Sequence, residues 1–238
     1  MSLVIDAEPV NTLAMQSLGH IAVHRPGATA VLRRHKLDFC CGGQVSLADA
    51  ARQKGLSMDA LVAELEALPQ GNAEPDGRTP GELVDHILVR YHAVHREQLP
   101  ELIRMARRVQ AVHREHPEVP RGLAELLETI EHEMLAHMSK EEMVLFPALR
   151  RGPSPMLAGP IGMMRHEHVD HGAQLEQLAR LTRDHTPPAD ACNTWRALYA
   201  GTRQFSEDLI AHIHLENNLL FPMFESACGN ANDPCGCA

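Results

Sequence analysis

Two copies of a His-x-x-x-Glu motif are the strongest chemical signal in this sequence. AHMSKEEMVLFP begins at Ala136 and AHIHLENNLLFP begins at Ala211, and the two share Ala, His, Glu, Leu, Phe and Pro at matching positions. Each copy has a second related segment upstream, HAVHREQL from His92 and HVDHGAQL from His168, at almost the same separation along the chain. The chain therefore contains a duplicated unit, in which one histidine precedes a His-x-x-x-Glu pair.

Residues four positions apart lie one turn apart on the same face of a helix. Each His-x-x-x-Glu pair can thus turn an imidazole and a carboxylate toward one point. Apolar residues share these two faces and predict that the faces turn inward: Ile130, Met134 and Val144 in the first copy, and Phe205, Leu209 and Leu219 in the second. We therefore predict six metal ligands in the protein interior: His92, His137, Glu141, His168, His212 and Glu216.

Six buried ligating groups need compensating charge, because an isolated buried carboxylate is strongly destabilising. Two divalent cations, each with two histidines and joined by both carboxylates, would supply that charge. Nitrogen and oxygen donors without a thiolate suit iron or manganese, and four histidines favour iron. A single structural zinc would use only four of the six groups. We therefore expect two non-haem iron ions, bridged by Glu141, Glu216 and an oxo group.

The ordinary interpretation of one His-x-x-x-Glu pair is a solvent-exposed contact on a helix surface. Two copies in register, each with an upstream histidine, favour metal binding instead. Glu133 and Asp208 precede the ligand histidines by four residues, and either accept a ring N–H from them or are solvated acids. Five other histidines are expected to be packing or surface residues, with His95 and His171 as candidates to line the cavity: His86, His95, His166, His171 and His214.

Long helical patterns must position these residues. Thr79-Pro80-Gly81-Glu82 is a strong helix start, with Thr as N-cap, Pro at N1 and Glu at N3. Four helices with short breaks predict an antiparallel bundle, and their expected ranges are 79–114, about 121–151, 159–184 and 190–226. Residues 1–69 are predicted to form a small helical module with helices at 46–53 and 57–68, followed by a linker (70–78), the bundle (79–226) and a tail (227–238).

Composition excludes several classes of partner. Lys and Arg total 22 against 31 Asp and Glu, a balance without the basic footprint of a protein that binds nucleic acid or an anionic membrane. The first residues lack the pattern of a signal peptide, and no apolar run approaches the roughly 20 residues of a membrane span. We therefore expect a cytoplasmic protein, whose six cysteines are thiols or ligands rather than a disulfide framework.

Cys40 and Cys41 are adjacent and are followed by Gly42 and Gly43. Neighbouring cysteines form a disulfide only with strain, so a bridge between them is not expected. Our hypothesis is that this module docks over the bundle and that one thiol relays iron, nitric oxide or redox equivalents; the alternative is a pair of small buried residues in a turn. Three further cysteines lie in the tail, which is expected to be disordered: Cys228, Cys235 and Cys237.

Taken together, these motifs resemble the Repair of Iron Centres family over nearly the whole chain. The resemblance covers LDFCCGG (37–43), DHILVRYHAVHREQLPEL (85–102), GPIGMMRHEH (159–168), HMSKEEMVLFP and HIHLENNLLFP. It implies a hemerythrin-like bundle, a small N-terminal domain with the Cys-Cys pair, and a di-iron centre. The ligands that the family implies fall on the same six residues, and Glu167 beside His168 would modulate the site.

The resemblance implies a protein that restores iron–sulfur clusters damaged by nitrosative or oxidative stress. Its partners would be damaged iron–sulfur proteins, with nitric oxide or oxygen as small ligands. No nucleic-acid or membrane partner is expected, and a homodimer is kept as an alternative to a monomer. Two other functions stay open: a hemerythrin-like carrier or sensor of oxygen or nitric oxide, and a di-iron enzyme such as a nitric oxide reductase. A plain carrier has no need of the Cys-Cys module, and the Glu-x-x-His pattern of ferritin-like proteins is absent.

Overall fold

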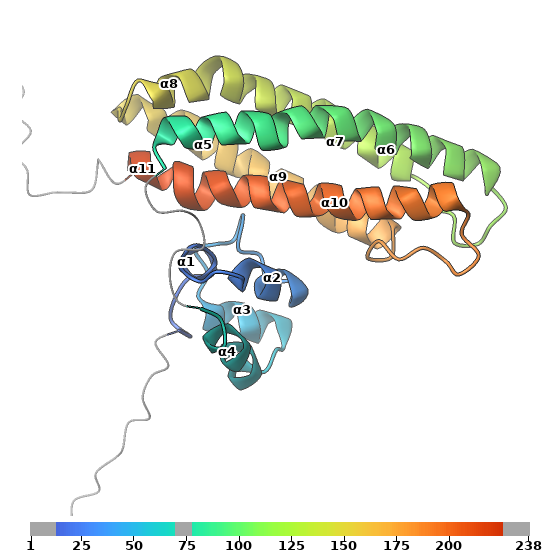
Figure 1. The fold of residues 1–238 in the computed structure, drawn as a ribbon, viewed down its shortest axis with the longest axis horizontal. Helices are drawn as coiled ribbons and strands as arrows, with labels where there is room; N and C mark the ends of the chain where they lie inside the picture. Colours follow the sequence, from blue (N-terminus) through green and yellow to red (C-terminus); the bar gives the residue numbers. More distant parts are fainter. Residues whose placement is uncertain (1–12, 70–77, 226–238) are drawn as a thin grey trace, which may run out of the picture. The chain divides into compact units, whose positions relative to one another are not determined.

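The computed structural model describes residues 13–69 and 78–225. The chain divides into two compact units, Met1–Gly77 and Arg78–Ala238, and each is described by itself (Figure 1). Apart from one isolated bridge between Ser17 and Ser46, the residues in these two ranges form helices and no strand. The expected all-α class is therefore confirmed. Within the same ranges, no helix is long and apolar enough to cross a membrane.

The N-terminal unit contains four short helices: α1 (Leu18–His24), α2 (Ala28–Arg34), α3 (Leu47–Lys54) and α4 (Met58–Glu66). The side chains of Ser17, Ser46 and Ser57 accept backbone N–H groups at the starts of α1, α3 and α4, as serine does at N-caps. The two starts expected from the sequence, at Ser46 and Ser57, are thus confirmed. Leucines and isoleucine from all four helices are buried and form the core of this unit: Leu18, Ile21, Leu32, Leu47, Leu61 and Leu65.

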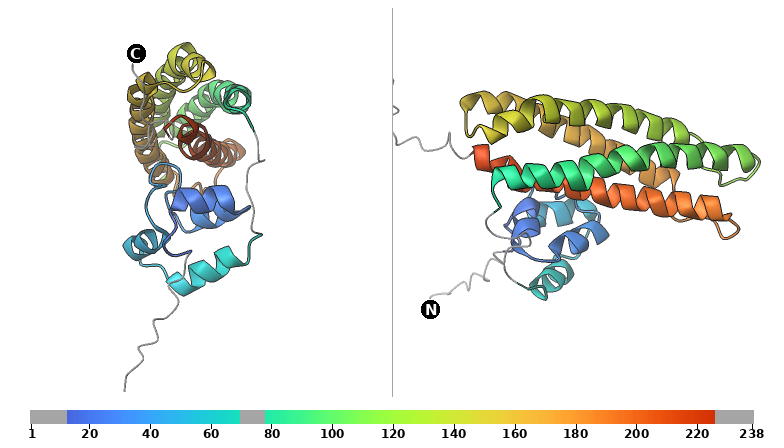
Figure 2. Two further views of the ribbon diagram at one scale, coloured as in Figure 1. Left: turned by 90° about the vertical axis from the view of Figure 1, so that its left-hand side faces the viewer. Right: turned by 45° about the horizontal axis from the view of Figure 1, so that its top comes forward.

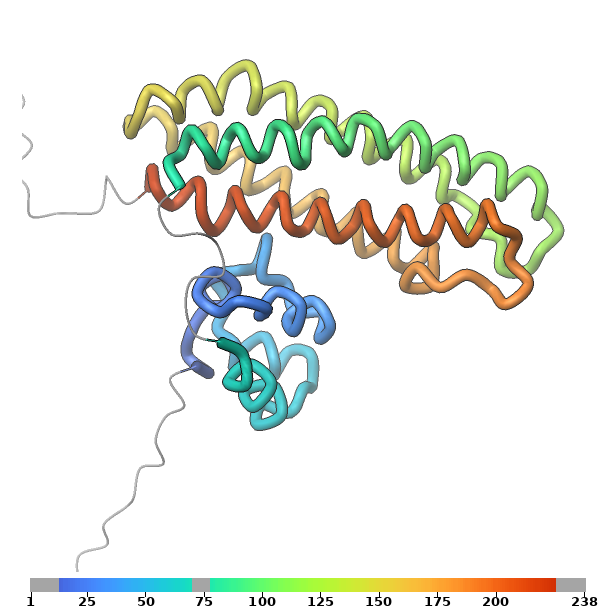
Figure 3. Tube along the Cα trace, viewed as in Figure 1, coloured from blue at the N-terminus to red at the C-terminus, as the bar shows by residue number. Residues whose placement is uncertain are grey.

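The second unit consists of four long helical rods, which Figure 3 traces without a break in each. The first rod runs through α5 (Pro80–Ile87), the π-helical turn η1 (Leu88–His92) and α6 (Ala93–Val112). The second rod runs through α7 (Leu123–Lys140), the π turn η2 (Glu141–Leu145) and α8 (Phe146–Arg150). After the short 3₁₀ turn η3 (Pro155–Leu157), the third rod is α9 (Ala158–Leu181). The fourth runs through α10 (Asn193–Leu215), the π turn η4 (Glu216–Leu220) and α11 (Pro222–Glu225).

Local chemistry sets the ends of these rods. The Thr79 hydroxyl accepts the N–H of Glu82 at 3.3 Å, and the Glu82 carboxylate accepts the N–H of Thr79 at 2.7 Å, so the expected capping box is present. The third rod ends at Leu181, earlier than the expected end at 184. It stops there because 183–185 adopt positive φ values of 54° to 56°, a left-handed backbone that cannot continue a right-handed helix.

The four rods pack in a closed ring. Contacts join α6 to α7, α7 to α9, α9 to α10, and α10 back to α6, and Figure 2 shows the rods of this unit side by side. Consecutive rods are neighbours joined by short connections, which makes them antiparallel. Large apolar side chains fill the interior on both sides of the middle of the bundle, including Phe146 and Phe221 toward one end and Phe205 and Trp195 toward the other.

The π turns correct one detail of the expected core. A helical repeat after Glu141 predicted that Val144 faces inward, yet 60% of Val144 is exposed and Leu145 is 2% exposed. Likewise Leu219 is only partly buried, whereas Leu220 is fully buried. A π turn closes its hydrogen bond after five residues instead of four, so the buried face moves on by one residue. The proline of each Leu-Phe-Pro segment accompanies this change, because proline has no N–H for the carbonyl four residues earlier.

Candidate metal centre

The six predicted ligands meet at one level of the bundle, inside the ring of rods. All six residues are at most 2% exposed. They form two groups of four in which the ligand atoms lie within 4.8 Å of one another. We call these groups subsite 1 (His92, His212, Glu141 and Glu216) and subsite 2 (His137, His168, Glu141 and Glu216). The two glutamates belong to both groups, so the arrangement would suit two cations that share the carboxylates.

Distances within the groups are short. Glu141 Oε2 lies 3.3 Å from His92 Nε2 and 3.4 Å from His137 Nε2. Glu216 Oε2 lies 3.1 Å from His168 Nε2, and Glu216 Oε1 lies 3.2 Å from His212 Nε2. Each glutamate therefore reaches one histidine of either subsite. All four imidazoles turn the same ring nitrogen, Nε2, toward the carboxylates.

The π turns supply part of this placement. His92 ends η1, Glu141 begins η2 and Glu216 begins η4. A single π turn inside an α-helix is rare and is often found at functional sites. The turns at Glu141 and Glu216 are related by the internal repeat, whereas His168 lies in the uninterrupted helix α9. The two halves are thus similar in ligand type but different in backbone.

Hydrogen bonds on the outer side of the rings determine which nitrogen is available. Nδ1 of His92 lies 2.8 Å from Glu142 Oε1, Nδ1 of His137 lies 2.8 Å from Glu167 Oε2, and Nδ1 of His168 lies 2.9 Å from Asn217 Oδ1. Each acceptor holds the ring proton on Nδ1, which leaves a lone pair on Nε2. The Nε2 atoms of His137 and His168 then face each other at 3.3 Å. Two lone pairs at that distance repel each other, and a cation between the groups would remove the repulsion.

The interior groups also lack ordinary hydrogen-bond partners. Among the residues that the structure describes, Nε2 of His92, both oxygens of Glu141 and Oε2 of Glu216 have none. Burial without partners is unfavourable for a carboxylate. Nitrogen and oxygen donors in this number are those that iron accepts in proteins. The residues present therefore fit a pair of iron ions.

The pKa values of the buried carboxylates and histidines also favour bound cations. Burial and the nearby Glu216 hold the pKa of Glu141 well above its ordinary value. Burial opposes ionisation of Glu216 too, but His212 and His168 hold its pKa well below the ordinary value. Burial lowers the pKa of His92 to about 4 and that of His137 to about 3, so both rings are neutral ligands near pH 7. The charge of each buried carboxylate thus opposes ionisation of the other, and two cations between them would stabilise both in the ionised form.

Of the two alternatives kept for these acids, the solvated acid holds for Glu133, which is exposed, and neither holds for Asp208, which is buried. Asp208 does not contact His212; instead it accepts a hydrogen bond from Arg90 at 2.5 Å. Glu133 accepts a hydrogen bond from Gln174. The acceptors that do contact ligand histidines are Glu142, Glu167 and Asn217. The repeat contained a signal for two of them, because Glu142 and Asn217 follow the paired glutamates and occupy the same position in the two copies.

The spare histidines separate into two classes. His166 has a solvent-exposed side chain, and His214 bonds to Asn218 at 2.8 Å. His95 is fully buried and His171 is 2% exposed, with ring centroids 5.5 Å from His212 and 5.2 Å from His137 respectively. These two residues therefore lie next to the ligands, one beside each subsite.

The cysteine pair lies in the loop between α2 and α3. The sulfurs of Cys40 and Cys41 are 3.6 Å apart and are not bonded to each other. Asp38 organises the loop, because its carboxylate accepts the N–H groups of Cys41 and Gly42, both at 2.9 Å. Glycine suits position 42, since a Cβ there would stand only 3.1 Å from two oxygens of Asp38. The tail cysteines Cys228, Cys235 and Cys237 lie outside the described residues.

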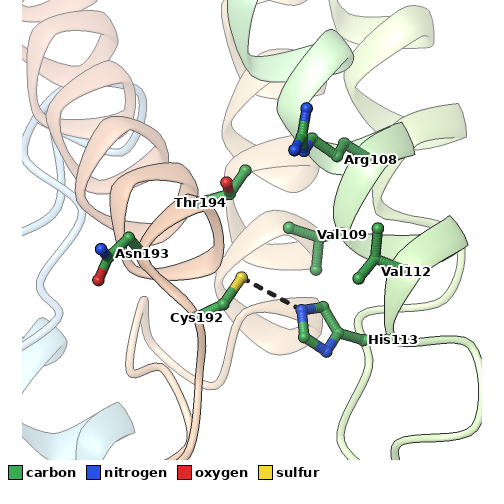
Figure 4. Close-up of a pocket in the computed structure, with 7 residues that line it drawn as sticks. All are labelled: Arg108, Val109, Val112, His113, Cys192, Asn193 and Thr194. Atoms are coloured by element: carbon green, nitrogen blue, oxygen red, sulfur yellow. Dashed lines mark hydrogen bonds between the residues drawn. The ribbon is translucent and has the colours of Figure 1, made fainter.

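A pocket of about 350 Å³ lies elsewhere in the bundle, near the end of α6 and the start of α10. Figure 4 shows its lining, with the sulfur of Cys192 3.1 Å from Nε2 of His113. None of the six predicted ligands lines this pocket. It is therefore separate from the candidate metal centre.

Comparisons with known proteins agree with this geometry. Residues 83–224 match the family described as Hemerythrin HHE cation binding domain, and residues 14–69 match ScdA_N, a Domain of Unknown function (DUF542). An iron-sulfur cluster repair protein YtfE from Yersinia pseudotuberculosis serotype IB (strain PB1/+) is 50% identical over 210 residues, which cover 87% of this chain and 95% of the relative. A protein of the same name from Enterobacter sp. (strain 638) is 47% identical over 209 residues, again covering 87% and 95%. The chain therefore belongs to the hemerythrin HHE cation-binding family, and within it to the group of the YtfE iron–sulfur cluster repair proteins.

Proposed function

We propose that this protein repairs iron–sulfur clusters damaged by nitrosative or oxidative stress, with a pair of iron ions held in subsites 1 and 2. The observation that carries the proposal is the sharing of Glu141 and Glu216 between two groups of ligand atoms. Relatives that cover 87% of the chain bear the name of iron–sulfur cluster repair proteins. Damaged iron–sulfur proteins would be its clients, and nitric oxide or oxygen its small ligands, in the cytoplasm.

The residues have distinct tasks in this proposal. His92 and His212 would hold one iron ion, His137 and His168 the other, and both glutamates would bridge them. Bound iron supplies electron transfer and the exchange of small ligands. Glu142, Glu167 and Asn217 keep the ring protons on Nδ1, so that the Nε2 lone pairs stay directed at the cations. Buried apolar side chains on both sides of this level, among them Phe146, Phe205 and Phe221, would keep water away from the ions.

Within the cysteine pair, we assign the thiol relay to Cys41. A hydrogen bond with Cys41, burial and the charge of Asp38 hold the pKa of Cys40 well above its ordinary value. The Cys40 thiol therefore stays protonated near neutral pH, and thiols react as thiolates. Cys41 is the more exposed of the two. Cys40 would then support the loop through its contact with Asp38, 3.4 Å away.

Metal content tests the site. Purified protein loaded anaerobically with ferrous iron should hold two iron ions per chain and, after oxidation, show ferric charge-transfer bands in its optical spectrum. The double variant His137→Ala, Glu141→Ala should hold none while keeping its helical circular dichroism. Loading of a single ion by the wild type, or full loading of the double variant, would refute the assignment of two subsites with shared carboxylates.

Reactivation of a damaged client tests the function. The iron-loaded protein should restore activity to an iron–sulfur dehydratase treated with nitric oxide, and the metal-free double variant should not. Cys41→Ser should slow reactivation, whereas Cys192→Ser, a matched change at a free cysteine of the second unit, should have no effect. A loaded wild type that restores no dehydratase activity would contradict the repair function while leaving the metal site intact. Equal rates for Cys41→Ser and the wild type would remove Cys41 from the proposal.

A further inference from the structure

His95 is an unusual residue for the interior of this bundle. Its side chain is fully buried, yet neither ring nitrogen has a hydrogen-bond partner among the residues that the structure describes. Buried polar groups nearly always have a partner, because burial removes their hydrogen bonds to water. A group that lacks one therefore calls for an explanation, and the surroundings of His95 point to a ligand.

Those surroundings are aromatic on several sides and include subsite 1. The ring centroid of His95 lies 5.4 Å from that of Phe205, 6.3 Å from that of Tyr91 and 5.5 Å from that of His212. His95 follows the predicted ligand His92 by three residues on the same helix. It belongs to neither group of atoms that lie within 4.8 Å of one another. The ring thus borders subsite 1 without being one of its ligands.

The corresponding residue of the second half behaves differently. His171 occupies the equivalent position in the segment that begins at His168, and its ring lies beside that of His137. Its Nδ1 lies 3.1 Å from Oε1 of Gln174, and Gln174 in turn donates a hydrogen bond to Glu133. This chain of contacts occupies the ring N–H of His171. His95 has no such anchor among the described side chains, so its N–H can be offered to a molecule that arrives from outside.

We propose that His95 donates a hydrogen bond to a small exogenous ligand, such as azide or nitric oxide, at subsite 1. This inference rests on the proposed function, since it needs a metal ion in that subsite. A neutral imidazole always carries one N–H donor, and full burial favours the neutral ring. Exclusion of water by Phe205 and Tyr91 would strengthen the bond, because the local dielectric is low.

Azide binding to the diferric protein tests the proposal. His95→Phe fills the space without a donor, His95→Gln restores an N–H, and His171→Leu is the matched control in the other half. Iron content and the band positions without azide should be the same in all four proteins. The azide Kd should rise roughly tenfold in His95→Phe, about the size expected for one hydrogen bond to a charged ligand. His95→Gln should recover most of this loss, and His171→Leu should bind azide as the wild type does.

A spectroscopic readout separates a hydrogen bond from a packing effect. The infrared stretching frequency of bound azide should shift between H₂O and D₂O in the wild type and in His95→Gln, but not in His95→Phe. Unchanged azide affinity in His95→Phe, or a wild type without a deuterium shift, would overturn the proposal. Loss of iron from both His95 variants would overturn it too, because His95 would then be a direct ligand. A wild type that takes up no iron refutes the proposed function itself, whereas the other outcomes refute only the role of His95.

Discussion

Substitution of Glu142 should weaken iron binding although Glu142 belongs to neither subsite. Its carboxylate lies 2.8 Å from Nδ1 of His92 and 2.8 Å from Arg96. Partial burial opposes ionisation, but the bonds with His92 and Arg96 outweigh it and lower the pKa of Glu142. The group is thus a carboxylate near pH 7, and it keeps the Nε2 lone pair of His92 directed at subsite 1.

The structure indicates the size of the effect. A hydrogen bond with one charged partner contributes about 1.5–3 kcal/mol. The Glu142 side chain is 31% exposed and is shared with Arg96, so solvent screening places it at the low end of that range. We expect Glu142→Ala to cost about 1.4 kcal/mol, or roughly a tenfold loss of iron affinity. Glu142→Gln keeps a neutral amide acceptor for His92, of the kind that Asn217 provides for His168. It should lower the iron affinity only about threefold.

Competition with a coloured ferrous chelator measures this affinity, with iron per chain read from the chelator absorbance. Glu176→Ala is the matched control, because Glu176 is an exposed carboxylate paired with Arg180 on the surface of α9. It should bind iron as the wild type does. Iron affinity within twofold of the wild type in a folded Glu142→Ala variant would refute the argument that this carboxylate orients His92. Equal losses of iron affinity in the Ala and Gln variants would refute the claim that a neutral acceptor at position 142 partly replaces the carboxylate.

Two further predictions concern stability, and both are checked by denaturant unfolding followed by circular dichroism. Gly201→Ala should destabilise the protein by about 1–3 kcal/mol, because its Cβ would stand 2.7 Å from Leu102. At Gly162 an added Cβ would have nothing within 4 Å, so Gly162→Ala should instead stabilise the protein by about 0.5–1 kcal/mol. Equal effects of the two substitutions would contradict the close packing of α10 on α6. Burial and, to a smaller extent, the charge of Arg203 lower the pKa of His185 from 6.5 to about 4. Between pH 6.5 and pH 4 this histidine therefore binds a proton in the unfolded chain but not in the folded chain. The free energy of unfolding should therefore fall as the pH falls through this window. Asn tolerates the left-handed backbone at this position, and over the same window the His185→Asn variant should lose about 1–2 kcal/mol less of this free energy than the wild type, after allowance for partial exposure. Parallel pH profiles of the two proteins would contradict this.

Local geometry accounts for what could be predicted of the fold. The capping box at Thr79, the serine starts at Ser46 and Ser57, and the four rods follow from hydrogen bonds and periodicity within a few residues of chain. The end of α9 could not be predicted in this way, because the three residues with positive φ after Thr182 include no glycine to announce them. The exchange of Val144 for Leu145 in the core likewise depends on a π turn, which a regular helical repeat does not contain.

The candidate centre shows the same division. Spacing within one helix brought His137 beside Glu141 and His212 beside Glu216, and the repeat added one histidine to each pair. The acids that contact the rings from outside could not be chosen from the sequence, and Asp208, one of the candidates, pairs with Arg90, 118 residues away in the chain. The choice depends on the rotation of each rod about its axis, which decides which acids face which rings.

The sequence by itself determined the helical class, the duplicated unit and the choice of six candidate ligands, since these follow from residue spacing along a single helix. Only the tertiary structure decided which histidines share a subsite, that Glu142, Glu167 and Asn217 hold the ring protons, and that His95 is buried without a partner among the described residues. These features depend on side chains from different rods. The relative rotation and axial shift of the rods arise from packing of the whole bundle, which no local spacing specifies.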